Sequence, residues 1–229
     1  MHAKSFSLIP SLDLTSLDEA ARLVEAVQAH PFVYGFKVGF SLGLAHGLPQ
    51  TVETIRKFTA KPVIYDHQKA ATDIPSTGAL FARVLSDAGI DEVILFPQAG
   101  PATLEAWAEA MMAKRLKTIV GVVMTHAKYL HSEGGYLADS SPVDIARRAK
   151  AAGVKAFVTP LTKPELVAKL AEETPFDAAD EFYSPGLGAQ GGDPKAFPAL
   201  ATHRLIVGRS LLNAPDPAAW IDSLASSLA

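Results

Sequence analysis

The chain has 229 residues, of which 48% are hydrophobic and 20% charged, with a formal net charge of −3 and no cysteine. This length holds one sizeable core, so we expect residues 1–229 to form a single domain. The absence of cysteine excludes disulfides, thiolate metal sites and cysteine nucleophiles. Lysine and arginine are scattered along the sequence, which argues against a nucleic-acid partner.

No segment approaches the roughly 18 uninterrupted apolar residues of a membrane-spanning helix. The stretch 1–14 has too short an apolar run for a signal peptide. We therefore expect a protein without a membrane partner that works in the cytoplasm.

Short apolar runs rich in β-branched residues recur along the chain and predict strands. They cover 6–12, 32–38, 62–65, 92–96, 117–124, 155–159, 181–184 and 204–208.

Between the predicted strands lie alanine- and leucine-rich segments with apolar residues at helical spacing, among them 17–30, 103–116 and 142–153. Ser16 or Thr15 is expected to cap the first of these, and Ser141 the last, with Pro142 in its first turn. Gly89 and Gly153 stand where helices are expected to end.

Strands that alternate with helices and lack polar alternation predict a parallel sheet covered on both faces. Eight such units favour a closed (β/α)8 TIM barrel over an open, doubly wound sheet, although periodicity alone does not distinguish them. In such barrels the chemistry lies where strands end and βα loops begin.

Polar side chains gather at these strand ends. Asp13, Lys37 and Asp66 each close a predicted strand, and Thr125 with His126 follows the fifth. A lysine at the end of a buried strand is costly to desolvate, so Lys37 is expected to pair with a carboxylate.

A glycine-rich stretch, "SPGLGAQGGD" (184–193), follows the seventh predicted strand, and "VGRS" with Arg209 follows the eighth. The GxGxxG spacing does not predict a dinucleotide site, because that motif belongs to the first βα turn of its fold. Barrels often bind phosphate after strands seven and eight, and we expect such a site here, with Arg209 as its cation. The alternative is that the glycines only shape a turn.

The histidines do not show a metal-binding spacing. His126 and His131 are five positions apart, which does not put both on one helical face, and no carboxylate completes a zinc set. Asp66 is a possible Mg²⁺ ligand together with a substrate oxygen. Our prediction is that the protein binds neither a metal nor a cofactor.

At these residues the chain resembles the orotidine 5′-monophosphate decarboxylase family over nearly its whole length. The matching segments are "SLDL" (11–14), "FKVG" (36–39), "DHQKAATDIPSTG" (66–78), "VMTH" (123–126), "PGLGAQGG" (185–192) and "VGRSLL" (207–212). The family's central motif usually reads Asp-x-Lys-x-x-Asp, whereas this chain has Asp66-x-x-Lys69-x-x-x-Asp73. On an extended strand such side chains converge only through a bulge or a turn.

The resemblance implies a cofactor-free lyase of uridine 5′-monophosphate biosynthesis that converts orotidine 5′-monophosphate, working as a homodimer with shared active sites. It implies that Lys69 protonates C6 within an array formed with Lys37, Asp66 and Asp73. The implied substrate contacts are Asp13 and Thr77 to ribose, Thr125 to the pyrimidine, and Gly188, Gln190, Gly208 and Arg209 to phosphate.

Two other functions remain open at this point. Related barrels, the hexulose-phosphate synthases and ketogulonate-phosphate decarboxylases, share the Asp–Lys–Asp theme but use Mg²⁺ and sugar phosphates. A non-catalytic protein that binds a phosphate ligand is the other alternative, since a fold alone does not determine function.

Overall fold

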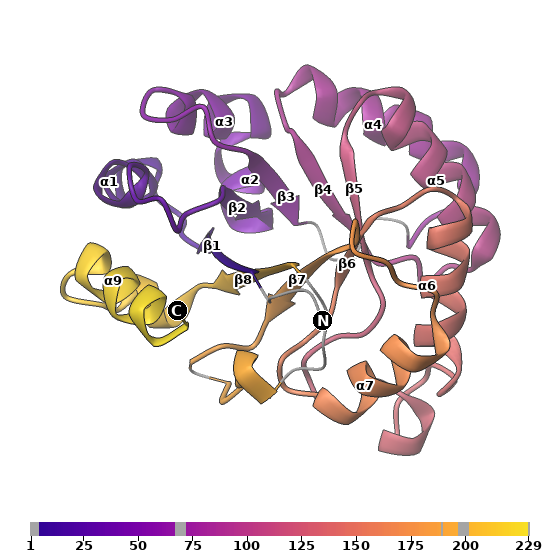
Figure 1. The fold of residues 1–229 in the computed structure, drawn as a ribbon. Coiled ribbons are helices and arrows are strands. Elements are labelled where there is room, and N and C mark those ends of the chain that lie inside the picture. The colour runs from indigo at the N-terminus through magenta and orange to yellow at the C-terminus, as the bar shows by residue number, and fades with distance from the viewer. Residues whose placement is uncertain (1–4, 67–71, 189, 197–201, 229) are drawn as a thin grey trace.

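The structure, a computed structural model, describes residues 5–66, 72–188, 190–196 and 202–228. Eight parallel strands follow one another around a closed barrel, which pairing between β1 and β8 completes (Figure 1). The strands are β1 (Ser5–Leu12), β2 (Phe36–Gly39), β3 (Val63–Asp66), β4 (Glu92–Leu95), β5 (Lys117–Gly121), β6 (Ala156–Val158), β7 (Glu181–Pro185) and β8 (Thr202–Val207). The predicted (β/α)8 TIM barrel is confirmed.

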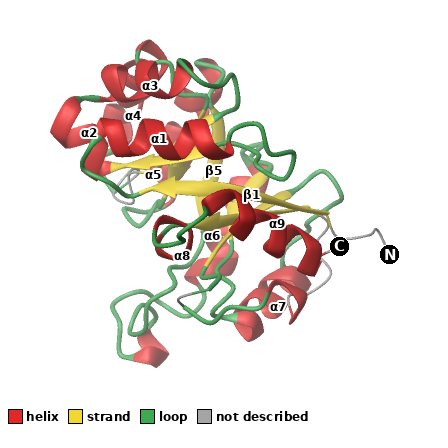
Figure 2. Ribbon diagram, turned by 90° about the vertical axis from the view of Figure 1, so that its left-hand side faces the viewer, coloured by secondary structure: helices red, strands yellow, loops and turns green. Residues whose placement is uncertain are grey.

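Helices surround the strands, which form the inner layer in both ribbon views (Figures 1 and 2). They are α1 (Leu17–Val27), α2 (Phe40–His46), α3 (Leu48–Arg56), α4 (Gly78–Asp87), α5 (Pro101–Ala113), α6 (Ser141–Ala151), α7 (Pro164–Glu173), α8 (Arg209–Leu212) and α9 (Pro217–Leu228). Short 3₁₀ turns cover Pro75–Thr77, His131–Glu133 and Pro194–Ala196. That residues 1–229 make up a single domain stays a prediction.

Most helix ends follow the local sequence signals. The hydroxyl of Ser16 accepts the Glu19 N–H at 3.3 Å, which caps α1 as predicted. Gly89 and Gly153 follow α4 and α6 with φ of +79° and +89°, a conformation that favours glycine. The expectation for Ser141 is wrong: the preceding serine takes the cap position, and Ser141 is the first residue of α6.

The second strand is shorter than the predicted 32–38 and begins only at Phe36. Phe32 and Tyr34 instead form single backbone hydrogen bonds with Leu8 of β1 and do not extend the ladder. At Gly35 a Cβ atom would lie 2.6 Å from the carbonyl oxygen of Pro62, so only glycine allows this close approach at the strand entry.

The core has two layers, as barrels require. Inside the barrel, inward-facing side chains from neighbouring strands pack against each other, among them Ile9, Ile64, Ile94 and Ile119. A larger layer fills the space between strands and helices. The interior is therefore a packed core, and polar side chains find room only at its two ends.

The amino-terminal end of the barrel is closed by a buried charge network. Glu92 accepts hydrogen bonds from the hydroxyls of Tyr34 and Tyr183, and Lys117 lies 3.7 Å from it and 2.6 Å from Glu181. Burial and the charge of Glu92 raise the pKa of both tyrosines, so they remain hydroxyl donors. This network stabilises the end of the barrel opposite the loops that carry chemistry.

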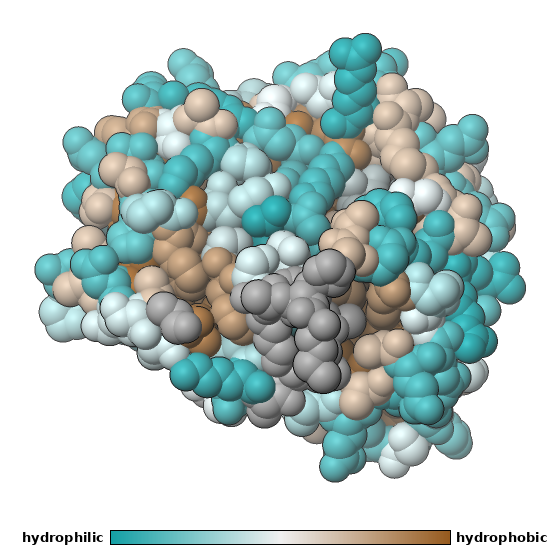
Figure 3. Space-filling model, viewed as in Figure 1, coloured by the Kyte–Doolittle hydropathy of each residue, from teal (hydrophilic) through white to brown (hydrophobic). Residues whose placement is uncertain are grey.

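The face of the molecule in Figure 3 is mostly polar. Charged and polar residues, in teal, cover much of the rim in Figure 3, while strongly hydrophobic residues, in brown, show mainly in the recesses between them. In the part of the chain that the structure describes, no helix is long and apolar enough to cross a membrane.

We predict that Glu92→Ala lowers the free energy of unfolding by about 3–5 kcal/mol, because it leaves the hydroxyls of Tyr34 and Tyr183 without their acceptor and removes one carboxylate from Lys117. Urea unfolding followed by circular dichroism measures this loss. The exposed Glu53→Ala on α3 is the control and is expected to change stability by less than about 0.5 kcal/mol. Equal stability of the two variants would show that the network contributes nothing.

Candidate active site

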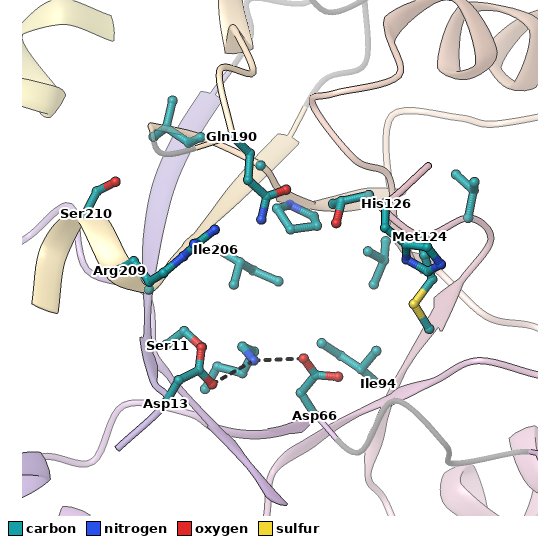
Figure 4. A pocket seen from close by; sticks show the side chains of 18 of the residues that line it. Ser11, Asp13, Asp66, Ile94, Met124, His126, Gln190, Ile206, Arg209 and Ser210 are labelled. Carbon is teal, nitrogen blue, oxygen red and sulfur yellow. Dashed lines mark hydrogen bonds and ion pairs between the residues drawn. The ribbon is translucent and has the colours of Figure 1, made fainter. Parts of the chain in front are cut away.

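A cavity of about 230 Å³ opens at the carboxyl ends of the strands, and each of the eight strands or the loop that follows it contributes to its wall (Figure 4). Its lining residues include Ser11, Asp13, Lys37, Asp66, Ile94, Phe96, Met124, Thr125, His126, Val158, Gly186, Gln190, Ile206, Gly208 and Arg209. The polar strand ends of the sequence thus converge on one site, as expected from the closed barrel.

Lys37 forms a buried ion pair at the floor of this cavity. Its Nζ lies 2.8 Å from Oδ2 of Asp66, and both side chains are less than a tenth exposed. The barrel register explains the contact: Lys37 is level with Ile64 of β3, so Asp66, two residues further along, points to the same inner face. The expected pairing of Lys37 with a carboxylate is confirmed.

Asp13 provides a second carboxylate for the same lysine. Its Oδ1 lies 3.6 Å from Lys37 Nζ, while its Oδ2 accepts the hydroxyl of Ser11 at 2.8 Å. Asp13 keeps 56% of its side chain exposed to the cavity. Lys37 thus contacts two carboxylates, that of Asp66, which is buried, and that of Asp13, which also faces the cavity.

The charges of this cluster hold Lys37 in its ammonium form. Burial alone would lower the pKa of Lys37, but the carboxylates of Asp66 and Asp13 outweigh it and raise the pKa above the ordinary value. Oδ1 of Asp66 is buried and has no hydrogen-bond partner among the described residues. An unfilled buried carboxylate oxygen is costly, so this atom is positioned to accept a further donor.

Lys69, the expected proton donor, lies outside the described residues, as does the rest of 67–71. Its position relative to Asp66 and Asp73, and hence the geometry of the longer central motif, stays a prediction.

Asp73 and Thr77 are described, and neither lines the cavity of its own chain. Asp73 is exposed and its Oδ1 accepts the N–H of Ile74 at 2.7 Å. The hydroxyl of Thr77 donates to the Ile74 carbonyl, while Thr103 of α5 donates to the Asp73 carbonyl at 2.8 Å. The structure therefore does not bring these two residues to Lys37 within one chain.

The loops after β7 and β8 form the opposite part of the cavity. Gln190 and Arg209 extend into it, and Asp13 and Asp66 lie below them in the view of Figure 4. At Gly208 a Cβ atom would lie 3.1 Å from the Asp13 carboxylate, which leaves little space for a side chain there. These residues place a guanidinium and an amide at the end of the site where phosphate was expected.

Gly188 lies behind this wall and does not line the cavity. It has φ of +73°, and a Cβ atom there would lie 2.5 Å from the hydroxyl oxygen of Ser210. The glycine is thus required for the loop to pack against the start of α8, a structural reason that sequence reasoning had weighed as an alternative to ligand binding.

Several lining residues were missed or given another interpretation from the sequence. Ser11 has a clear signal in retrospect, because it stands two positions before Asp13 and shares its side of the strand. His126 was placed with Thr125 after the fifth predicted strand but was given no role, and it lines the cavity wall. Met124 and Phe96 add an apolar surface on the same side.

No group of three or more His, Cys, Asp or Glu side chains within 5–66, 72–188, 190–196 and 202–228 is arranged to hold a metal ion. The cavity pairs a buried cation and two carboxylates at its floor with Arg209 above, next to an apolar wall that suits a flat ring.

Comparison with known proteins agrees with this geometry. The chain is 34% identical to the orotidine 5′-phosphate decarboxylase of Methanosarcina mazei over 92% of this chain and 89% of that protein. It is 30% identical to that of Pyrococcus furiosus over 92% of both. The crystal structure of orotidine 5′-monophosphate decarboxylase from Methanocaldococcus jannaschii with the inhibitor BMP superposes with a TM-score of 0.82, at 27% identity, covering 97% of this chain and 98% of that one.

The family model of the Orotidine 5′-phosphate decarboxylase / HUMPS family matches residues 7–223, from within β1 to within α9. The barrel, the buried Lys37–Asp66 pair and the loops after β7 and β8 all lie within this match. The chain belongs to the Orotidine 5′-phosphate decarboxylase / HUMPS family.

Proposed function

We propose that the protein decarboxylates orotidine 5′-monophosphate to uridine 5′-monophosphate, the last step of de novo pyrimidine biosynthesis, without a cofactor. The observation that carries this proposal is the buried Lys37–Asp66 pair, joined by Asp13, on the floor of a cavity with Arg209 at its other end. Relatives that are 30–34% identical over nearly the whole chain have this activity in their names. The expected cytoplasmic location stays a prediction.

The reaction breaks the bond between C6 and the carboxyl carbon, so that CO₂ leaves and the electron pair stays on C6. This pair lies in the ring plane and has no adjacent π-acceptor, so a fixed cation must stabilise it. We assign this role to Lys69, whose ammonium then transfers a proton to C6. The free Oδ1 of Asp66 supports the assignment, because a second ammonium there would satisfy it.

In this proposal Lys37 positions the catalytic carboxylate. Its ion pair holds the Asp66 carboxylate at the cavity floor, where the proposal also places the second lysine. The proposal also places the substrate carboxylate next to Asp66, whose negative charge repels it in the ground state.

The remaining contacts divide the substrate among the loops. Arg209, with Gln190 and the backbone of Gly208, is assigned to the phosphate, and Asp13 to the ribose hydroxyls. Thr125 follows β5 and is assigned to the pyrimidine. Binding energy at the phosphate end orients the ring over the catalytic cation.

The direct test is the loss of absorbance of orotidine 5′-monophosphate incubated with the purified protein. We expect turnover that persists after exhaustive treatment with EDTA, because the proposed electrophile is an ammonium rather than a metal ion. Activity that EDTA abolishes and Mg²⁺ restores, or activity on hexulose phosphates instead, would place the protein with the sugar-phosphate enzymes. Nucleotide binding without turnover would favour a non-catalytic protein.

Arg209→Ala is expected to lower kcat/KM for orotidine 5′-monophosphate, with a loss of transition-state stabilisation of about 2–5 kcal/mol, because it removes the charged partner of the phosphate. The nucleoside orotidine, which lacks phosphate, should be a poor substrate of wild type and scarcely poorer for the variant. Arg147→Ala on the exposed face of α6 is the control and should leave both unchanged. Equal losses on both substrates would make Arg209 a structural residue.

Exposed apolar side chains on α2 and next to Asp73 support a homodimer with shared sites. Phe40 and Leu44 of α2 are 65% and 78% exposed, and Ile74, next to Asp73, is 59% exposed. Exposed apolar side chains such as these are available for contact with a partner chain, which supports the proposed dimer. A two-fold axis here would bring Asp73 and Thr77 of each chain toward the other chain's cavity.

Complementation tests the shared site. Lys69→Ala and Asp73→Ala should each be nearly inactive, but after co-refolding about half the dimers are mixed, and each has one intact site. Activity should then recover to about a quarter of wild type. If mixed dimers are shown to form and the activity stays at the level of the parents, Asp73 serves its own chain.

A further inference from the structure

The loop between β6 and α7 holds the chain segment that follows β5 at two points. The hydroxyl of Thr162 donates to the carbonyl of Thr125 at 3.4 Å, and Nζ of Lys163 donates to Oε1 of Glu133 at 2.6 Å. The segment between these points begins with Thr125 and His126, which line the cavity. Lys163 and Glu133 do not line it.

The carboxylate of Glu133 connects the two loops through both of its oxygens. Oε1 accepts Lys163, and Oε2 accepts the backbone N–H of Tyr129 at 3.0 Å. The hydrogen bond from Lys163 and that from Tyr129 lower the pKa of Glu133, so the group is ionised at neutral pH. Lys163 Nζ also lies 5.9 Å from the centroid of the Tyr129 ring.

Tyr129 connects Glu133 to the cavity wall through its contact with His126. Its ring packs edge to face against the ring of His126, with centroids 5.6 Å apart. Its hydroxyl accepts the amide of Gln98 at 3.1 Å, so the ring is held at both ends. The position of His126 therefore depends on the position of Tyr129, and that in turn on Glu133.

Lys163 at one end of this connection and Lys128 near the other each have an energetic cost in their local backbone setting. Lys163 stands at the N-cap of α7, where Ser, Thr, Asp or Asn is preferred and where the helix dipole disfavours a cation. Lys128, next to Tyr129, has φ of +58°, which is uncommon for a residue other than glycine. Local costs of this kind are typical of positions retained for a function.

We propose that Lys163 is a positioning residue for the base-binding wall, acting through Glu133 and Tyr129 to hold Thr125 and His126 in place. The assignment of that wall to the pyrimidine rests on the function proposed above. The Lys163 side chain is only 13% exposed, so its pair with Glu133 is less screened than an ordinary surface ion pair.

Kinetics of Lys163→Met and Glu133→Gln test the proposal. Each should lower kcat/KM for orotidine 5′-monophosphate by about ten- to a hundredfold, because displacement of a substrate contact by even 1 Å is costly. Lys163→Arg should retain most of the activity. The matched control is Lys169→Met, which removes the exposed ion pair with Glu173 on α7 and should leave kcat/KM unchanged.

Two further measurements separate positioning from general damage. Binding of ribose 5-phosphate, which lacks the base, should have the same Kd in Lys163→Met and wild type, whereas uridine 5′-monophosphate should bind less tightly to the variant. The double variant should be no worse than the poorer single variant, since both changes break one connection. Equal weakening of both ligands, or additive losses, would overturn the proposal.

Amide hydrogen exchange of the ligand-free protein tests the connection without any substrate. The Tyr129 amide should exchange at least tenfold faster in Lys163→Met and Glu133→Gln than in wild type, and at the wild-type rate in Lys169→Met. Unchanged exchange would overturn the positioning role even if wild type decarboxylates the nucleotide. Faster exchange in a protein that does not turn over the nucleotide would instead contradict only the proposed substrate.

Discussion

The site depends on one constraint, the need to neutralise a lysine at the buried end of β2. Lys37 is inside the barrel, and only carboxylates on neighbouring strands can offset the cost of burying its charge. The register supplies them: Lys37 is level with Ser11 and Ile64, and Asp13 and Asp66 each lie two residues beyond these. Removing either partner would leave a buried charge, so the pair and the strand register support each other.

The carboxylates at the two ends of the barrel differ in how fully they are hydrogen-bonded. At the amino-terminal end, the carboxylate of Glu92 is saturated by two tyrosine hydroxyls and lies near a lysine. At the other end, Oδ1 of Asp66 has no partner among the described residues, and Asp13 faces the cavity. A layer of isoleucines separates the two networks. Saturated polar groups stabilise a fold, whereas unfilled ones are available to a ligand.

The loops around the cavity are linked to one another as well as to the strands. Leu161, in the β6–α7 loop, donates its N–H to the carbonyl of Pro185 at 2.9 Å, and its Cβ would be 2.4 Å from a side chain at Gly192. Two residues further on, Lys163 reaches Glu133 in the β5–α6 segment. This short loop thus contacts both the glycine-rich wall and the wall that contains Thr125, so the base and phosphate ends of the site are built on a common support.

The sequence by itself determined the order of strands and helices and the need of Lys37 for a carboxylate, and it favoured a closed barrel through the number of its βα units. These follow from local rules: apolar periodicity, glycine at helix ends, and the cost of a buried charge. It also pointed to Arg209, because the phosphate end of a barrel is fixed by strand order, whereas Gln190 followed from the family resemblance.

Only the tertiary structure decided which groups meet. It showed that both Asp13 and Asp66 reach Lys37, and that Asp73 does not line the cavity of its own chain. It also joined Lys163 to Glu133, thirty positions away along the chain. Such contacts depend on how strands align around a closed barrel and how loops pack over it, and no local pattern of residues encodes either.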